Sequence, residues 1–287
     1  MPPTSEPVAD RTVEEVFGPA TPGEDPVLAQ LAAAALAAAD GSARLAAEAF
    51  GAGHTIDTKS SSTDLVSEVD RASEAHITAV LADLRPDDGL LGEEGALEEG
   101  TTGIRWVIDP LDGTTNYLFG VPAWSISIAA ERDGEPIVGL VADPAHGELW
   151  AAIAGRGARR NGNRLAVADG RSTLGTALVG TGFSYDADRR AWQAAVLGHV
   201  LPRVRDIRRF GSAALDLCAV AAGQLDGYYE WGVHAWDIAA GTIICREAGG
   251  RVDVHPGGLA VAATPSLQAP LNGLLADAGA LVPPDAA

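Results

Sequence analysis

The segment 104–116 reads Ile-Arg-Trp-Val-Ile-Asp-Pro-Leu-Asp-Gly-Thr-Thr-Asn, and it decides the fold and chemistry that we expect. Its apolar first half predicts a buried strand that ends at Asp109, where Pro110 turns the chain. Asp112 follows three residues after Asp109, with the Leu111 carbonyl between the two acids. Two carboxylates and a carbonyl within one short turn can hold two hard cations a few ångströms apart. The alternative is a loop in which Asp serves turn geometry only, but this pattern exceeds what a turn requires.

The residues after these aspartates favour phosphate as the ligand. Gly113 and Thr114 offer backbone N–H groups at a turn or helix start, which suit phosphate oxygens. The spacing argues against one class of phosphatase, which forms an aspartyl-phosphate at an Asp-x-Asp-Gly-Thr motif. Here two residues separate the acids, so the spacing favours attack by metal-activated water over a covalent aspartate.

Two further acidic segments follow or interrupt apolar ones. Glu93 lies in Gly92-Glu93-Glu94-Gly95, directly after a short predicted strand, and projects into a loop. Asp237 lies at the start of a predicted helix within the segment 229–241. A carboxylate there also suits the positive end of the helix dipole, so Asp237 is read equally well as a cap or as a ligand.

The order of predicted elements indicates layers of helices and sheets. Long helices are expected at 26–50 and 69–84 and an antiparallel meander at 125–168, with a tight turn at Asn161-Gly162. Strands and helices alternate after residue 176, which is typical of an α/β arrangement. We therefore expect a flexible N-terminal tail at 1–25, an α+β half with an antiparallel sheet and the metal site at 26–170, and an α/β half that completes the substrate pocket at 171–287.

Composition narrows the class of protein. The chain has 287 residues, 47% of them hydrophobic, which is enough for a substantial core. A net charge of −19 argues against nucleic acid as a partner, whereas divalent cations held by carboxylates would admit an anionic substrate. The sequence shows no apolar run of about 18 residues and no secretory signal, so we expect no membrane partner and a cytoplasmic protein. Cys218 and Cys245 are expected to be buried hydrophobes.

Together these segments resemble the inositol monophosphatase family of magnesium-dependent, lithium-sensitive phosphatases. The resemblance covers about residues 26–275 and is nearest to bacterial inositol-1-monophosphatases. The matching segments, in family order, are 59–70, Gly92-Glu-Glu, 109–116, 157–162 and Trp236-Asp-Ile-Ala-Ala-Gly. The resemblance implies a layered αβαβα sandwich of the sugar-phosphatase type, shared with fructose-1,6-bisphosphatase, and a homodimer.

The resemblance also implies roles for individual residues. Two or three Mg²⁺ would be bound, and Asp70 and Thr114 would orient and deprotonate the attacking water without a phosphoenzyme. Lys59 falls where the family has a lysine on a loop over the metals, although a loop lysine is more often a solvated charge. The metal ligands would be Glu93, Asp109, the Leu111 carbonyl, Asp112 and Asp237, with Glu93 also serving catalysis, and the substrate would be held by Asp112, Gly113, Thr114, Ser212, Ala213, Glu230 and Asp237.

The substrate predicted from the resemblance is myo-inositol monophosphate. Glu230 lies seven residues before Asp237, as does the family acid that binds inositol hydroxyls, although it is also read as an exposed strand-end acid. A carboxylate there would repel a second phosphate but could accept the amine of histidinol phosphate, so histidinol-phosphate phosphatase is the alternative enzyme. A regulatory or binding protein of the same fold is the alternative class, and the full set of predicted metal ligands counts against a purely non-catalytic role.

Overall fold

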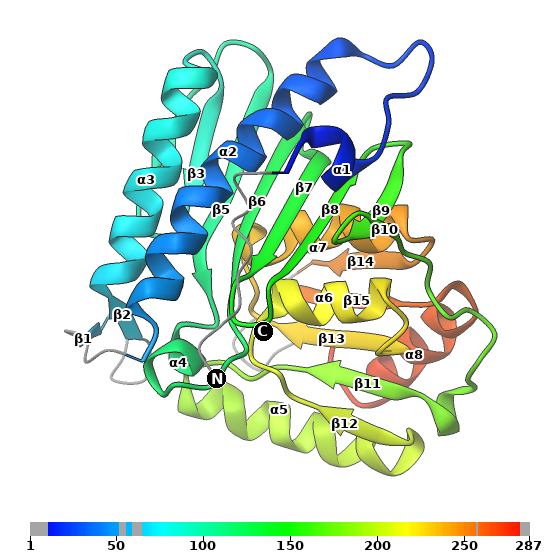
Figure 1. Ribbon diagram of the computed structural model, residues 1–287. Helices are drawn as coiled ribbons and strands as arrows, with labels where there is room; N and C mark the ends of the chain where they lie inside the picture. The colour runs from blue at the N-terminus through cyan, green and yellow to red at the C-terminus, as the bar shows by residue number, and fades with distance from the viewer. Residues whose placement is uncertain (1–10, 52–55, 59–64, 257, 282–287) are drawn as a thin grey trace.

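Five layers of helices and sheets make up the protein. The computed structural model describes residues 11–51, 56–58, 65–256 and 258–281. Two helices cover one sheet, two more lie between this sheet and a second one, and two cover the far face of the second sheet (Figure 1). The predicted αβαβα sandwich is therefore confirmed.

The larger sheet has eight strands in the order β10-β9-β8-β7-β6-β5-β3-β4. Neighbouring strands are antiparallel except β3 and β5, which are parallel. The predicted turn at Asn161-Gly162 joins β9 to β10, and both residues have positive φ. The strands are β3 (Gly89–Gly92), β4 (Leu97–Glu98), β5 (Ile104–Asp112), β6 (Ser125–Arg132), β7 (Glu135–Asp143), β8 (Glu148–Ile153), β9 (Gly157–Arg160) and β10 (Asn163–Arg164).

The smaller sheet has five strands in the order β12-β11-β13-β15-β14. The three strands β12, β11 and β13 run parallel, and β15 is antiparallel to both of its neighbours. All five strands follow residue 170 in the chain, and we propose the division into two halves there on this ground. They are β11 (Leu178–Thr181), β12 (Asp206–Arg208), β13 (Gly227–Trp231), β14 (Arg251–His255) and β15 (Leu259–Ala263).

The longer helices form three layers, which alternate with the two sheets. α2 (Pro26–Ala49) and α3 (Glu68–Leu84) cover the outer face of the larger sheet. α6 (Ala213–Ala221) and α7 (Ala235–Glu247) lie between the sheets, and α5 (Ala187–Val200) and α8 (Pro265–Asp277) lie on the far side of the smaller one (Figure 1). The short elements are α1 (Val13–Phe17), α4 (Thr114–Leu118), the hairpin β1 (Ile56–Thr58) and β2 (Leu65–Ser67), and 3₁₀ turns at Leu174–Thr176 and Leu201–Arg203.

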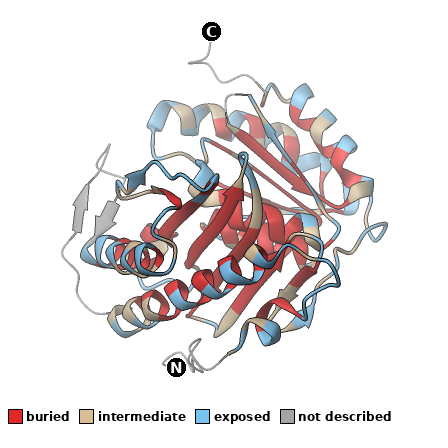
Figure 2. Ribbon diagram, turned by 90° about the horizontal axis from the view of Figure 1, so that it is seen from above, coloured by how far each residue is buried: buried red, intermediate tan, exposed pale blue. Residues whose placement is uncertain are grey.

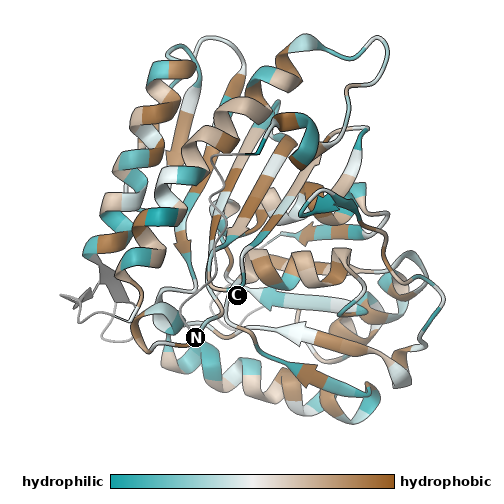
Figure 3. Ribbon diagram, in the orientation of Figure 1, coloured by the Kyte–Doolittle hydropathy of each residue, from teal (hydrophilic) through white to brown (hydrophobic). Residues whose placement is uncertain are grey.

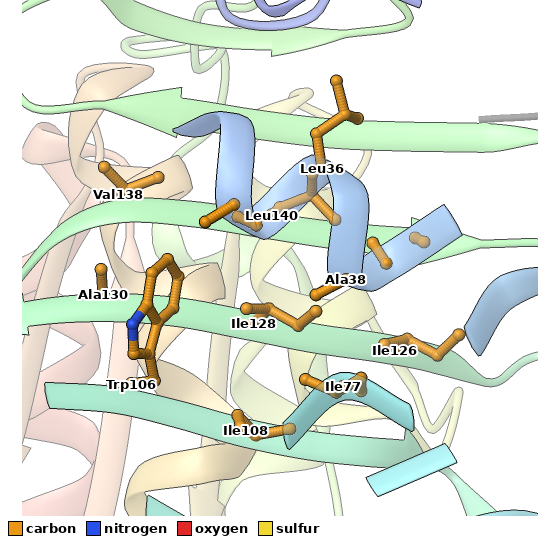
Figure 4. Packing of buried hydrophobic residues seen from close by; sticks show 14 of the residues in the cluster. Leu36, Ala38, Ile77, Trp106, Ile108, Ile126, Ile128, Ala130, Val138 and Leu140 are labelled. Carbon is orange, nitrogen blue, oxygen red and sulfur yellow. The ribbon is translucent and has the colours of Figure 1, made fainter. Parts of the chain in front are cut away.

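Both faces of the central strands are buried, so these strands appear red in Figure 2. Alternate residues of β5 point to opposite faces: Trp106 and Ile108 pack under α2 and α3, whereas Val107 packs toward α7. Figure 4 shows the first of these clusters, in which Ile77 of α3 lies over the strands. In Figure 3 the central strands of the larger sheet are mostly brown, the colour of apolar residues. The sheet that contains β5, the strand that ends in the aspartate segment, is therefore buried between two layers of helices.

α2 is long and apolar enough to cross a membrane by length and composition alone, and it is the one described helix that passes this test. Its apolar window is 61% buried inside the fold. Residues such as Leu31 and Ala35 are fully buried in the cluster that includes β6 and β7. Packing on the sheet therefore accounts for its hydrophobicity.

The predicted tail at 1–25 is wrong from residue 11 onward. Thr12 and Glu15 form a reciprocal capping box that starts α1. Phe17 is fully buried in the cluster beneath α2. Glu24 forms a buried ion pair with Arg156, which lowers the pKa of the Glu24 carboxyl to about 2. This segment is part of the folded core, because it supplies both an apolar anchor and a paired charge.

Candidate active site

A cleft of about 860 Å³ opens where the end of β5 meets the N-terminal ends of α6 and α7. Its walls come from segments far apart in the sequence. The predicted site residues that line it are Glu93, Asp109, Leu111, Asp112, Gly113, Thr114, Ala213, Glu230 and Asp237. The structure thus brings nine of the twelve predicted site residues to one cavity.

The aspartate segment bends at the cleft because β5 is irregular there. The pairing of β5 with β6 shifts register between Asp109 and Asp112, which leaves the intervening residues free of the ladder. The Leu111 N–H donates to Asp109 Oδ1 at 2.9 Å. Gly113 has φ +92°, and a Cβ at this position would lie 3.0 Å from two backbone carbonyl oxygens, those of Ala123 and Gly211. Only glycine fits this turn without strain.

Asp112 is held by the start of α6. Its Oδ2 accepts hydrogen bonds from the Ser212 hydroxyl at 2.5 Å and from the Ala214 N–H at 2.8 Å. Burial raises the pKa of Asp112 to about 6, although these two donors act to lower it. Ser212 is itself the N-cap of α6 and does not line the cleft. Its side chain therefore orients an acid of the site.

Thr114 and Asp70 form a buried pair beside the cleft. The Thr114 hydroxyl lies 2.9 Å from Asp70 Oδ1 and 3.1 Å from the Leu111 carbonyl oxygen. Asp70 is fully buried on α3, and Thr114 is 7% exposed at the cleft wall. A hydroxyl that donates to a buried carboxylate directs a lone pair outward, where it can accept a proton from water.

The carboxylates facing the cleft repel one another. Burial raises the pKa of Asp109 well above its ordinary value, and the charges of Glu93, Asp112 and Asp237 raise it further. Burial and the charge of Asp112 likewise raise the pKa of Asp237. Asp237 accepts the His234 N–H at 2.6 Å, so it caps α7 and also lines the cleft. Such clustered, ionisable acids are a pattern of functional sites.

Glu230, on β13, also lines the cleft. Its Oε2 accepts the Tyr228 hydroxyl at 2.9 Å. Burial raises the pKa of Glu230 to about 7, against the lowering effects of Tyr228 and the Arg209 charge. Asp216 on α6 is 1% exposed, and neither of its carboxylate oxygens has a hydrogen-bond partner among the described residues. Burial followed by the charge of Glu230 raises the pKa of Asp216 well above its ordinary value.

The sequence profile of the inositol monophosphatase family matches residues 27–279, which is most of the chain. The chain belongs to the inositol monophosphatase family. Inositol-1-monophosphatase of Mycobacterium leprae is 44% identical over 77% of this chain and 83% of its own. Nus factor SuhB of Pasteurella multocida is 49% identical over 70% of this chain and 76% of its own.

A solved structure gives the same fold. The SuhB protein of Bartonella henselae superimposes with a TM-score of 0.79 at 35% identity, over 85% of this chain and 97% of that one. The family resemblance predicted from the sequence is thus confirmed, together with the layered fold.

The donors at the cleft fit the hard divalent cations that this family would use. All are oxygen ligands, the kind that Mg²⁺ prefers. The pKa values of Asp109, Asp112 and Asp237 are all raised, so these acids lack enough positive charge around them in the protein alone. Among the described residues, no three His, Cys, Asp or Glu side chains already surround a single point as a cage.

Sequence reasoning missed several residues that build the site. Tyr228 and Arg209 act on Glu230, and Glu74 and Ser73 hold the loops that carry the acids. Glu74 could have been found, because it lies one helical turn after Asp70 on the same face of α3. Lys59 lies outside the described residues.

Proposed function

We propose that the chain hydrolyses myo-inositol monophosphate to inositol and phosphate, with Mg²⁺ as the cofactor. The observation that carries this proposal is the meeting, in one cleft, of Glu93, Asp109, Asp112 and Asp237 with the Thr114–Asp70 pair. The first four supply cation ligands, and the pair supplies a proton acceptor. The M. leprae relative, named as an inositol-1-monophosphatase, supports the same reaction.

The chemistry divides between the cation and the protein. Mg²⁺ bound at these carboxylates and the Leu111 carbonyl would supply positive charge that acidifies water and stabilises the departing oxygen. Ser212 and the Ala214 N–H orient Asp112 for that role. Thr114 accepts a proton from the attacking water while its own proton passes to Asp70. The new P–O bond forms in line with the one that breaks, and the alkoxide leaves as inositol after taking a proton from solvent.

The leaving group would contact the wall that carries Glu230. A carboxylate can accept hydrogen bonds from two polyol hydroxyls, and the Tyr228 hydroxyl fixes its orientation. Ala213 also lines the cleft, as the family resemblance implies for the pocket backbone. Histidinol phosphate remains the alternative substrate, since an acid also binds an amine.

A panel of phosphate esters tests the proposal. Phosphate release with Mg²⁺ would be measured for myo-inositol 1-phosphate, histidinol phosphate, fructose 1,6-bisphosphate and 3′-phosphoadenosine 5′-phosphate. We expect a preference for inositol 1-phosphate, lost on chelation. A preference for histidinol phosphate would keep the metal chemistry and overturn the substrate. No Mg²⁺-dependent release from any ester would overturn the enzymatic function.

Two or three Mg²⁺ per site, inhibition by lithium, a cytoplasmic location and a homodimer belong to the same proposal. They rest on the family resemblance. Light scattering would test the dimer, and a monomer mass at working concentration would contradict it.

A second function is favoured by one observation, the 49% identity to a relative named Nus factor SuhB. We propose a regulatory role in transcription as this second function. Affinity capture of the chain from its own cells, followed by mass spectrometry, tests it. Recovery of transcription proteins with both the wild type and an inactive Asp109→Asn variant supports a role independent of catalysis, and recovery of none contradicts it.

A further inference from the structure

One face of α3 carries three polar side chains that are buried. Asp70, Ser73 and Glu74 are 0%, 0% and 6% exposed. Their spacing of three and four residues places them side by side on the helix. Buried polar groups are costly unless they are hydrogen-bonded, so the partners of these three show what the face is for.

Glu74 binds the turn that carries Glu93. Its Oε2 accepts the Glu94 N–H at 2.8 Å, and its Oε1 accepts the Ala96 N–H at 3.0 Å. Both oxygens of one carboxylate therefore hold the backbone on the C-terminal side of Glu93. A Cβ at Gly92 would overlap the same carboxylate, so the turn approaches Glu74 closely.

The rest of the turn is fixed to the strands. The Gly92 N–H donates to the Ala96 carbonyl at 2.7 Å, and the Glu93 N–H donates to the Ile108 carbonyl at 3.2 Å. The backbone of Glu93 is thus held from β5 on one side and, through Glu94 and Ala96, from α3 on the other.

The same helix face holds the aspartate segment. Ser73 donates to the Pro110 carbonyl at 2.8 Å, and Asp70 accepts the Thr114 hydroxyl at 2.9 Å. A rigid helix therefore contacts both loops of the cleft, the turn of Glu93 and the segment of Asp109 and Asp112. The distance between the acids of the two loops depends on these contacts.

We propose that Glu74 is a positioning residue, which sets the affinity of the cleft for divalent cations by fixing Glu93 relative to Asp109 and Asp112. The inference rests on the proposed role of those acids as cation ligands. Residues that hold metal ligands in place, without binding the metal, typically change metal affinity by about 10–100-fold when replaced.

Direct binding of Mn²⁺ tests the inference without substrate. The free ion is read from its electron paramagnetic resonance signal in titrations of the metal-free full-length protein. Glu74→Gln keeps the shape of the side chain. Its amide nitrogen, however, cannot accept a hydrogen bond from the backbone N–H that it would face, so one of the two bonds to the turn is lost. We expect its Mn²⁺ dissociation constant to rise at least 10-fold.

Two further variants make the result specific. Glu98→Gln, in the exposed strand β4, removes the same charge nearby at a residue that does not line the cleft, so its dissociation constant should stay within twofold of the wild type. Gly92→Ala crowds the Glu74 carboxylate without replacing it, and it should weaken Mn²⁺ binding as Glu74→Gln does. Circular dichroism would check that each variant is folded.

The possible outcomes separate this inference from the proposed function. A Glu74→Gln protein that is less stable yet binds Mn²⁺ as Glu98→Gln does would overturn the inference, and so would a wild type that binds no Mn²⁺. A wild type that binds Mn²⁺ but releases no phosphate from any ester would overturn the proposed function. In that case, a 10-fold loss of binding in Glu74→Gln would still support the positioning role.

Discussion

Raising the pH is expected to destabilise the protein when divalent cations are absent. The pKa of Asp112 is raised from 3.8 to about 6 and that of Glu230 from 4.5 to about 7, in both cases chiefly by burial. An acid with a raised pKa in the folded state binds its proton more tightly there than in the unfolded chain. Its contribution to stability is therefore lost as the pH rises from the unfolded pKa to the folded one.

The size of the effect follows from these two pKa values. Each pH unit between the unfolded and folded pKa is worth 1.36 kcal/mol. From pH 5 to pH 8, about one such unit remains for Asp112 and about two for Glu230, so these two acids together should lower the free energy of unfolding by about 4 kcal/mol. The raised pKa values of Asp109, Asp216 and Asp237 act in the same direction and should add to this fall. Glu24, whose pKa is lowered to about 2, contributes its stability in full above about pH 5 and adds no slope in this window.

Urea denaturation in EDTA, at half-unit steps from pH 5 to pH 8, measures this slope. Glu230→Gln is the internal control and should reduce the fall by about 3 kcal/mol, the share of Glu230. Addition of Mg²⁺ should restore stability, and more at pH 8 than at pH 5, because cations compete with protons for the same carboxylates. A metal-free protein whose free energy of unfolding stays constant or rises over this range would refute the reasoning, because the ionised acids would then not destabilise the folded state.

Three other predictions concern single residues. Asp109→Asn should lower turnover by more than about 100-fold, measured as phosphate release, and raise the metal-free stability at pH 8, measured by urea denaturation. Near-normal turnover would contradict the assignment of Asp109 as a metal ligand. Glu230→Gln should raise KM for inositol 1-phosphate about 10-fold with kcat nearly unchanged, in steady-state kinetics, because a charged hydrogen-bond acceptor is lost; an unchanged KM would remove Glu230 from the pocket. Asp216→Asn should stabilise the protein by about 1–3 kcal/mol at pH 8 and by less at pH 5, as urea denaturation would measure. The reason is that burial raises the pKa of this acid, which has no hydrogen-bond partner among the described residues. The same gain in stability at both pH values would contradict this explanation.

The sequence predicted those parts of the fold that depend on local pattern. The strands β5 and β6 were predicted because strands buried on both faces consist of continuous apolar residues. The turn at Asn161-Gly162 was predicted because Asn and Gly favour the positive φ that this turn requires. The folded segment from residue 11 was missed although Thr12-x-x-Glu15 is a capping-box pattern. Its charged and proline-rich neighbours concealed one short helix and a single buried Phe17.

The cleft was predicted less completely than the fold. The acids that lie in short motifs, such as Asp109 and Asp112, were found, whereas Arg209, which also lines the cleft, was not. Glu74 and Ser73, which hold the backbone of the loops that carry the acids, were not found, because their partners are distant in sequence. Glu74 binds a turn about 20 residues away. Ser212 was predicted to hold the substrate, but its hydrogen bond to Asp112 across 100 residues was not predicted. Only the three-dimensional packing of α3 and α6 reveals those contacts.

The cleft combines a stable frame with acids that oppose the stability of the metal-free fold. Asp109, Asp112 and Asp237 all have raised pKa values, so the cluster favours protons or cations. If the loops were free to separate, they would relieve this repulsion by moving apart. The contacts of α3 with both loops prevent that separation, and so the cost of holding the acids together is offset when a cation binds. Cation affinity in this protein is therefore a property of the α3 frame as much as of the ligands.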